Sequence, residues 1–285
     1  MKGYKGFAPG LICRGKQYAE NTVFEEEKAV ICNSGMHFCE NPFDVLDYYG
    51  FVNDNGELND FAEVEALADT KTDDKKKFCT TKLKVGAKLS FSGFVNACVD
   101  FVIEKTTTKM PKSKLSSGNY AKIGSSGDSA KIGSSGYSAQ IGSSGNYAQI
   151  GSSGYYAKIG SSGDSAQIGS SGDSAKIGSS GYSAQIGSSG DSAQIGSSGN
   201  CAKIGSSGYS ARINSKGENS VICCAGHGSM VKAKVGSWIT LSEWKYNEKK
   251  GRAVPLCVKT EYVDGERIKA DTFYKLEGGE FVECQ

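Results

Sequence analysis

The sequence predicts a mainly β protein in which a central nonapeptide-repeat β-solenoid, similar to a β-roll, is flanked by an N-terminal α+β domain and a C-terminal β-meander cap. Two observations predict the solenoid. Near-identical nonapeptides follow one another from Ser116, and glycine is abundant, at 38 residues, while proline is scarce, at 4. A short fixed period rich in glycine is typical of a repeat fold. The expected domains are residues 1–112, 113–232 and 233–285.

Each repeat reads S-S-G-x-y-A-z-I-G, where x is Asn, Asp or Tyr, y is Ser, Tyr or Cys, and z is Lys, Gln or Arg. Ile recurs every nine residues from Ile123 to Ile213, and Ala does so from Ala121 to Ala211. Because Ala and Ile stand two residues apart, y-A-z-I is expected to form a strand that turns both toward the core. Gly-Ser-Ser-Gly is expected to form the turn. Two or three nonapeptides could complete one coil.

Metal binding by the repeats is not expected. Calcium-binding nonapeptide proteins share the period but place Asp regularly in the turn. Here Asp occupies position x in only some copies. Cys223, Cys224 and His227 cluster after the repeats but lack the spacing of zinc ligands. We therefore expect neither a metal nor another cofactor.

The segments on either side of the repeats carry mixed secondary-structure signals. Phe61–Leu67 and Thr81–Val85 alternate like strands, and residues 91–103 are expected to be rich in strand. Asn41 is expected to cap a short helix that begins at Pro42. These elements predict an α+β domain.

The C-terminal segment is expected to cover the last coil, because both ends of a solenoid expose unpaired strand edges. A strand is expected at Ser237–Leu241, and hairpins are expected at Asp264-Gly265 and Gly278-Gly279.

Charge and cysteine content restrict the classes of partner and compartment. The chain has 33 Lys+Arg and 31 Asp+Glu, so bulk electrostatic binding of nucleic acid is not expected. It has neither an apolar run long enough to span a membrane nor a stretch typical of a signal peptide. The 10 cysteines are scattered and are expected to be reduced thiols. These features predict a cytoplasmic protein.

One segment carries a resemblance. Gly35–Tyr49 reads G-M-H-F-C-E-N-P-F-D-V-L-D-Y-Y and, together with Lys5-Gly6-Phe7, resembles an uncharacterised domain family of phages and bacteria. Val263–Tyr274 is similar to the ending that such proteins share. The resemblance implies a phage or mobile-element protein in the cytoplasm of a bacterial host, and it implies no activity.

A second resemblance concerns part of the same segment. Gly35-x-His37-Phe38-x-x-Asn41, followed by a helix ending in Tyr48-Tyr49, is similar to a segment of ADP-ribosyltransferase-like folds. It implies a pocket for NAD, for which Arg14 and Glu104 are the nearby catalytic candidates. Neither of these two residues lies in a recognisable motif.

The repeats also offer candidate binding residues. Aromatic side chains interleaved with lysines can stack on bases or sugars, or simply on one another. The repeat candidates are Tyr137, Tyr155, Tyr156 and Tyr182.

Together these features predict a non-enzymatic interaction protein that binds a bacterial host protein or a small nucleotide-like signalling molecule, as an antagonist of host defence. The alternatives are a divergent ADP-ribosyltransferase-like, NAD-dependent enzyme and a virion-associated adhesin. A homo-oligomer is compatible with the sequence. The candidates outside the repeats are His37, Tyr48, Tyr49, Arg14 and Glu104.

Overall fold

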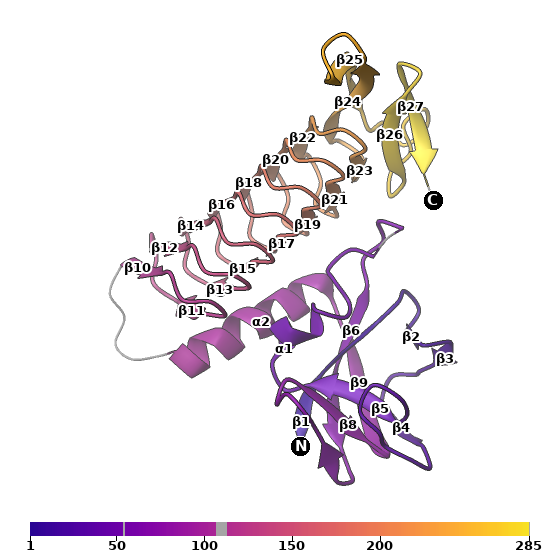
Figure 1. Ribbon diagram of the computed structural model, residues 1–285, viewed down its shortest axis with the longest axis vertical. Helices are drawn as coiled ribbons and strands as arrows, with labels where there is room; N and C mark the ends of the chain where they lie inside the picture. The colour runs from indigo at the N-terminus through magenta and orange to yellow at the C-terminus, as the bar shows by residue number, and fades with distance from the viewer. Residues whose placement is uncertain (54, 107–112, 285) are drawn as a thin grey trace.

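The computed structural model describes residues 1–53, 55–106 and 113–284. It confirms the mainly β architecture: a straight β-solenoid runs through the molecule, an α+β domain lies along one side of it, and a strand cap closes its C-terminal end (Figure 1). The N-terminal domain meets the solenoid through its helices, so the two parts form adjoining layers.

Each coil of the solenoid contains two nonapeptides, which settles the coil size. Strands pair in parallel with the strand one coil away, and Ile141 therefore lies opposite Ile159, 18 positions later. The coils number about 7. Each coil contributes one strand to each of two parallel sheets, which we call the open face and the covered face.

The strands of the open face within the solenoid are β10 (Ser113–Ser116), β12 (Lys131–Ser134), β14 (Gln149–Ser152), β16 (Gln167–Ser170), β18 (Gln185–Ser188), β20 (Lys203–Ser206) and β22 (Val221–Cys224). Those of the covered face are β11 (Lys122–Ser125), β13 (Gln140–Ser143), β15 (Lys158–Ser161), β17 (Lys176–Ser179), β19 (Gln194–Ser197), β21 (Arg212–Ser215) and β23 (Met230–Lys232).

The strand within each repeat lies two residues later than the y-A-z-I predicted from the sequence. It consists of z-I-G-S, so the first Gly and Ser of the expected turn are strand residues. Ile and the final Ser point inward, whereas z and Gly point outward. The inward Ile and the Ala two residues before it are buried, as expected, except that Ala121 in the first repeat is only partly buried. The shift arises because residue y has a left-handed conformation, as in Ser174 (φ 55°), and a strand cannot begin there.

The turns are held by contacts between successive coils. Where x is Asp or Asn, its carboxylate or amide oxygen accepts a hydrogen bond from the backbone N–H of x one coil later, as Asp173 Oδ1 does from Asp191 N (2.9 Å). The scattered aspartates of the repeat therefore have a structural role. Among the described residues, no three His, Cys, Asp or Glu side chains converge as metal ligands. Cys224 faces the core, whereas Cys223 is exposed on the open face.

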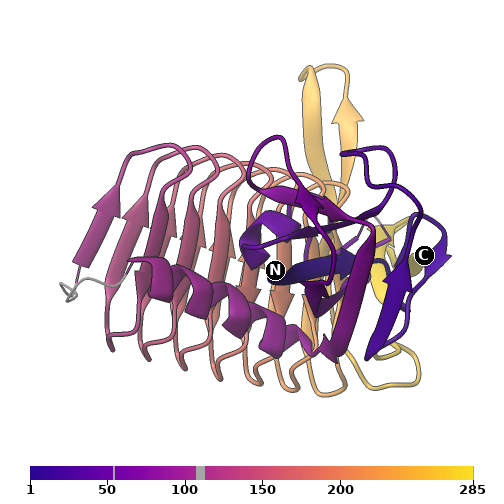
Figure 2. The same ribbon diagram turned by 90° about the horizontal axis from the view of Figure 1, so that it is seen from below.

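The N-terminal domain is a seven-stranded antiparallel sheet, ordered β4-β9-β6-β1-β5-β8-β7. Two helices lie between this sheet and the solenoid (Figure 2). The element bounds are β1 (Lys2–Phe7), β2 (Ile12–Cys13), β3 (Lys16–Gln17), β4 (Thr22–Glu25), β5 (Met36–Cys39), α1 (Pro42–Val45), β6 (Asp60–Ala66), β7 (Thr70–Lys71), β8 (Lys77–Thr80), β9 (Lys82–Leu89) and α2 (Phe91–Thr106).

The expected strands around Phe61 and Leu83 are confirmed as β6 and β9, and the Asn41 cap of α1 is confirmed, since Asn41 Oδ1 accepts the N–H of Phe43. The expectation of strand at residues 91–103 was wrong, because this segment is the helix α2. Its aromatic and β-branched residues favour strand, but they recur every three or four positions and so form helical ridges.

The cap extends both sheets of the solenoid. The hairpin β24 (Trp238–Asn247) and β25 (Arg252–Tyr262) continues the open face, and β26 (Phe273–Glu277) with β27 (Glu280–Cys284) continues the covered face. Gly278-Gly279 closes the second hairpin, as expected. Asp264-Gly265 does not close a hairpin, because it lies in the connection between the two sheets.

Candidate functional site

A cavity of about 270 Å³ opens in the N-terminal domain. The strand β1, the β2–β3 turn, β5 and the segment that follows α1 form its walls. Four of the five non-repeat candidates line it: Arg14, His37, Tyr48 and Tyr49. The residues Gly35–Tyr49 therefore serve two surfaces, because Asn41 and Asp44 point the other way and bind Gln140 of the solenoid.

Lys5 forms the base of the cavity. Its side chain is only 5% exposed, and its Nζ donates to the carbonyl oxygen of His37 (2.9 Å). The rings of Phe7 and Tyr18 each lie 5.4 Å from the same ammonium group. Burial lowers the pKa of Lys5, and Cys13 beside it acts in the opposite direction. No carboxylate forms an ion pair with Lys5 among the described residues.

The thiol of Cys13 joins Lys5 to the aromatic wall. Cys13 Sγ lies 3.4 Å from Lys5 Nζ and accepts a hydrogen bond from the hydroxyl of Tyr49 (3.2 Å). Burial raises the pKa of Tyr49, so this phenol is protonated at neutral pH. Gly6 allows Tyr49 to pack against β1, since a Cβ at Gly6 would lie 2.6 Å from Tyr49 Cβ.

The rim of the cavity carries further cations. Lys77 Nζ lies 4.7 Å from the centroid of the Tyr48 ring and 2.9 Å from Cys32 Sγ. The guanidinium of Arg14 contacts the carbonyl oxygens of Cys32 and Asn33, each at 3.5 Å. Both contacts leave donor capacity in Arg14 and Lys77.

The cavity has a surplus of positive charge. Its lining includes four cations (Lys5, Arg14, Lys16 and Lys77) and one carboxylate, Glu26, which leaves a formal charge of 4 − 1 = +3 with His37 neutral. Glu26 is already engaged, because Lys16 Nζ lies 2.9 Å from Oε1 and Gly35 N donates to Oε2. Such a surface is suited to a negatively charged ligand.

His37 is held as a neutral imidazole. Its Nε2 accepts a hydrogen bond from the backbone N–H of Cys32 (3.1 Å), and an acceptor nitrogen carries no proton. Burial lowers the pKa of His37, and the charges of Lys5, Arg14 and Lys77 lower it further. His37 therefore orders the 32–37 loop at the cavity mouth.

The remaining candidates lie elsewhere. Glu104 is on α2 and lines a separate surface hollow with Glu63 and Lys84, so the structure does not bring it together with Arg14. Tyr137, Tyr155 and Tyr156 lie on one turn edge of the solenoid, and Tyr182 lies on the other, all of them exposed.

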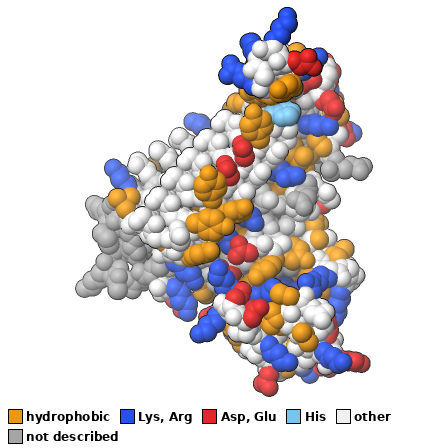
Figure 3. Space-filling model, in the orientation of Figure 1, with side chains coloured by type: hydrophobic (Ala, Val, Ile, Leu, Met, Phe, Trp, Pro, Cys, Tyr) orange, Lys and Arg blue, Asp and Glu red, His pale blue; other side chains and the backbone are white. Residues whose placement is uncertain are grey.

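The tyrosines of the first edge partly pack on one another. The Tyr137 ring centroid lies 5.8 Å from that of Tyr120 and 5.4 Å from that of Tyr156. Hydrophobic and acidic side chains follow one another along an edge of the solenoid in Figure 3. They form a rough ridge and leave no closed site.

Three cavity residues, Lys5, Cys13 and Lys77, were not singled out from the sequence. Lys5 had a signal, because it belongs to the Lys5-Gly6-Phe7 strand on which the first resemblance rests. Lys77 had no such signal, because antiparallel pairing of β5 with β8 places it opposite Cys39, and α1, β6 and β7 lie between these two residues in the sequence.

Comparison with known proteins adds one finding for this part of the chain. Residues 1–97 match the model of a family described as a domain of unknown function, DUF7666. No curated protein and no solved structure matches the chain. The match covers the whole seven-stranded sheet and the cavity, and it ends within α2.

Proposed function

We propose that the chain is a non-enzymatic binding protein whose N-terminal cavity takes up a small anionic ligand with an aromatic group, of the nucleotide class. The surplus of three positive charges beside aromatic rings carries this proposal. Arg14 and Lys77 at the rim would contact phosphate oxygens, since guanidinium and ammonium groups form strong hydrogen bonds to them. Tyr48 and Tyr49 supply faces on which a base can stack.

The size of the cavity supports a small ligand. At about 270 Å³ it lies just below the range of about 300–1,000 Å³ usual for small-molecule sites. Its charged groups lie beside apolar side chains such as Phe38 and Val45. A polymer would need an extended groove, which this part of the domain does not offer among its described residues.

The titratable groups that line the cavity support binding of a ligand without its chemical conversion. His37 is committed to the backbone of Cys32, and the only carboxylate in the lining, Glu26, is committed to Lys16 and Gly35. Neither is placed to exchange a proton with a ligand. Glu104, the residue that an NAD-dependent transferase would have required, lines a different hollow.

The resemblance of the Gly35–Tyr49 segment suggests the setting. In a bacterial cell carrying the phage or mobile element that encodes this chain, a binder of this kind would remove a nucleotide signal from solution and so oppose host defence. The solenoid would act as the rigid support for the ligand-binding domain.

The test is titration calorimetry of the full chain with mono-, di- and cyclic nucleotides, NAD and inorganic phosphate. At least one nucleotide should bind, and Arg14→Ala and Lys77→Ala should each weaken binding by about tenfold, or about 1.4 kcal/mol. Lys84→Ala is the matched control, because Lys84 is an exposed cation of the same domain outside the cavity.

Mass spectrometry of the bound ligand separates binding from catalysis. Recovery of unchanged nucleotide supports the proposal, and turnover of NAD would instead establish the transferase. Binding by Arg14→Ala and Lys77→Ala equal to that of the unaltered chain would place the ligand elsewhere and reject the cavity as its site.

A further inference from the structure

The two faces of the solenoid have almost the same sequence but different surroundings. On both, the outward residues of each strand are z and Gly. The glycines form a shallow trough that runs along the solenoid axis, and z forms the rim. One trough is filled by this chain's own α2, and the other is bare.

On the covered face, the trough seats an apolar ridge of α2 formed by residues four positions apart. A Cβ at Gly196 would lie 2.5 Å from the Phe91 ring, and one at Gly178 would lie 2.9 Å from Val95 Cγ2. At Gly142 even the helix backbone is close, with Val99 Cα 3.1 Å from the Cβ position. The absence of side chains is what lets the helix approach.

The rim of the covered face is paired with acceptors on the N-terminal domain. Lys158, only 3% exposed, forms an ion pair with Asp47 (2.6 Å). Gln140 Nε2 donates to Asp44 Oδ1 (2.7 Å), and Lys176 Nζ donates to the carbonyl oxygen of Leu46. The covered face therefore binds the apolar ridge of α2 in its trough, while carboxylates and a carbonyl of α1 and the residues that follow it meet its rim.

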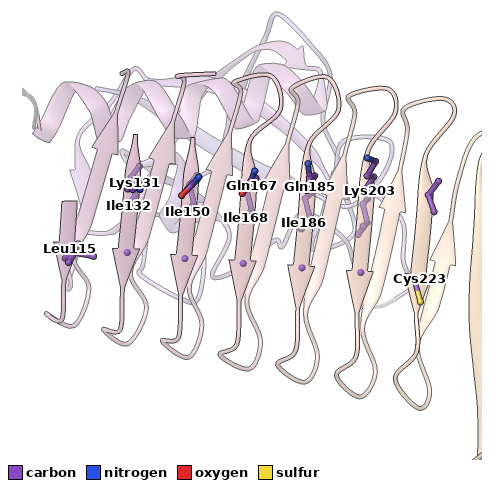
Figure 4. Close-up of a pocket in the computed structure, with 18 residues that line it drawn as sticks. Leu115, Lys131, Ile132, Ile150, Gln167, Ile168, Gln185, Ile186, Lys203 and Cys223 are labelled. Carbon is purple, nitrogen blue, oxygen red and sulfur yellow. The ribbon is translucent and has the colours of Figure 1, made fainter. Parts of the chain in front are cut away.

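The open face has the same arrangement of z and Gly (Figure 4), and among the described residues no segment covers its glycines from Gly151 to Gly205. A Cβ at Gly151, Gly169, Gly187 or Gly205 would meet no atom within 4 Å. The rim is formed by exposed Lys131, Gln149, Gln167, Gln185 and Lys203.

Charge and apolar residues define what the open trough can accept. Its lining contains two lysines and no acidic residue among the described positions. At its C-terminal end Val221 and Trp238 are 54% and 48% exposed, and Trp238 packs on Tyr262 with ring centroids 5.1 Å apart. The trough is thus cationic at the rim and ends against an exposed aromatic pair.

We propose that the open face docks an acidic amphipathic α-helix of a partner protein, in the way that the covered face docks α2. The helix would lay apolar residues, spaced i, i+4 and i+8 like Phe91, Val95 and Val99, along Gly151–Gly205. Its carboxylates would meet Lys131 and Lys203, and an apolar residue at one end would pack on Val221 and Trp238. This surface is independent of the nucleotide cavity.

The probe is a stapled 16-residue helix, the length of α2, that carries the Phe-Val-Val ridge of Phe91, Val95 and Val99 with glutamates on both flanks. Fluorescence anisotropy of this helix is measured with the full-length chain, alongside the same helix bearing lysines in place of the glutamates. The acidic helix should bind, and the lysine helix should bind at least about tenfold more weakly, or about 1.4 kcal/mol.

Two variants locate the binding. Gly169→Val combined with Gly187→Val fills the open trough without a clash and should reduce binding about tenfold or more, which is about 1.4 kcal/mol. Lys131→Glu with Lys203→Glu should also reduce it, whereas Lys249→Glu with Lys250→Glu, in the exposed β24–β25 turn, should not.

Three results would overturn the proposal. The first is absence of binding by the acidic helix, and the second is binding that the filled trough leaves unchanged. The third is a concentration-dependent dimer in sedimentation velocity that Gly169→Val with Gly187→Val abolishes, because the face would then be covered by a second copy of this chain. Circular dichroism of each variant confirms that the solenoid is intact.

Discussion

Glycine occupies two positions of each nonapeptide for different physical reasons. In the turn, a Cβ at Gly172 would lie 2.1 Å from the carbonyl oxygen of Gly154 in the preceding coil. Neither atom can move away, because both belong to the backbone of stacked coils. On the open face, a Cβ at Gly169 would meet nothing within 4 Å. Glycine is therefore obligatory in the turn and replaceable at the strand position of the open face.

We expect Gly172→Ala to lower the free energy of unfolding by about 3 kcal/mol, at the upper end of overpacking costs. Gly169→Ala, three residues away, should leave it unchanged or raise it by about 0.5–1 kcal/mol, since alanine restricts the unfolded chain. Urea denaturation followed by circular dichroism measures both. Equal losses of unfolding free energy in the two variants would show that contact between stacked turns is not the reason for glycine at position 172.

His37 predicts a pH dependence of stability. Its pKa is lowered in the folded chain, chiefly by burial, from the 6.5 of an unperturbed histidine. As the pH falls through 6.5 toward the lowered value, the unfolded chain takes up a proton that the folded chain does not. The free energy of unfolding should therefore decrease over this window, and it should be fully retained above it.

The measurement compares urea unfolding at pH 7.5 and pH 5.5 for the unaltered chain and for His37→Gln. Glutamine keeps an acceptor for the N–H of Cys32 but does not titrate, so the variant should lose less stability on acidification. His227→Gln serves as control, because His227 lies on an exposed turn edge against Tyr209. An identical pH profile for His37→Gln and the unaltered chain contradicts the prediction.

At the scale of elements, the sequence pattern predicted those features that depend only on neighbouring residues. The nine-residue period, the inward Ile and Ala and the Asn41 cap all follow from spacing and propensity. The residue at which each strand begins could not be predicted in this way. The left-handed conformation at y is imposed by hydrogen bonds between coils, such as that from Ser174 N to Asp191 O (2.7 Å). Most positive-φ residues of the array are serine, which carries no sequence signal for that conformation.

The helix α2 also could not be predicted from local pattern, because its partners are distant in the sequence. Its aromatic and β-branched residues favour strand, but they pack on the glycine trough of the covered face on one side and on Phe61 of β6 on the other, with the Phe61 and Phe94 ring centroids 3.7 Å apart. The cavity was partly predictable: His37, Tyr48 and Tyr49 belong to the segment of the second resemblance, Arg14 was a candidate outside any motif, and all four line the cavity. Lys77 could not be found, because strand pairing across the sheet brings it there.

The contact between α1 and the solenoid can be tested at the Lys158–Asp47 pair. Lys158 is buried and Asp47 is 45% exposed, so removing the carboxylate leaves a buried ammonium without its partner. We expect Asp47→Ala to lower the free energy of unfolding by about 1–3 kcal/mol, less than for a fully buried pair because Asp47 is partly solvated.

Adding Lys158→Met to Asp47→Ala should restore most of this loss, since methionine fills the site without a charge. Glu280→Ala removes the partner of the exposed Lys259 and should cause no measurable change. Thermal and urea unfolding are measured for the unaltered chain, Asp47→Ala, the double variant and Glu280→Ala. A double variant no more stable than Asp47→Ala would indicate that the pair contributes by shape and not by charge.

Across the whole molecule, the N-terminal domain touches the solenoid and its cap together. Besides seating α2, it packs Gly56 on Phe273 of β26, with a Cβ position 2.7 Å from the ring. Phe273 shares one apolar cluster with Phe43, Phe51 and Val95. The number of coils between α2 and the cap is therefore set by the domain that spans them.

No helix among the described residues is long and apolar enough to cross a membrane.

Because of this arrangement, the effect of deleting repeats on folding should depend on how many nonapeptides are removed. Removing 179–187 deletes one nonapeptide, which is half a coil, so every later strand changes faces and both cap hairpins attach to the wrong sheets. Removing 179–196 deletes one full coil and keeps the faces, although it draws the cap about 4.8 Å toward α2. We expect the shorter deletion to prevent compact folding and the longer one to fold with a lower melting temperature.

Size-exclusion chromatography and thermal circular dichroism distinguish the two outcomes. In the longer deletion the Gly56–Phe273 contact is lost, and Phe273→Ala should then have less effect than it has in the full chain, because the two changes remove the same contact. Deletions that behave alike, or a shorter deletion that folds better, would mean that the faces of the solenoid are interchangeable. The difference between α2 on one face and a bare trough on the other would then have no role in assembling the molecule.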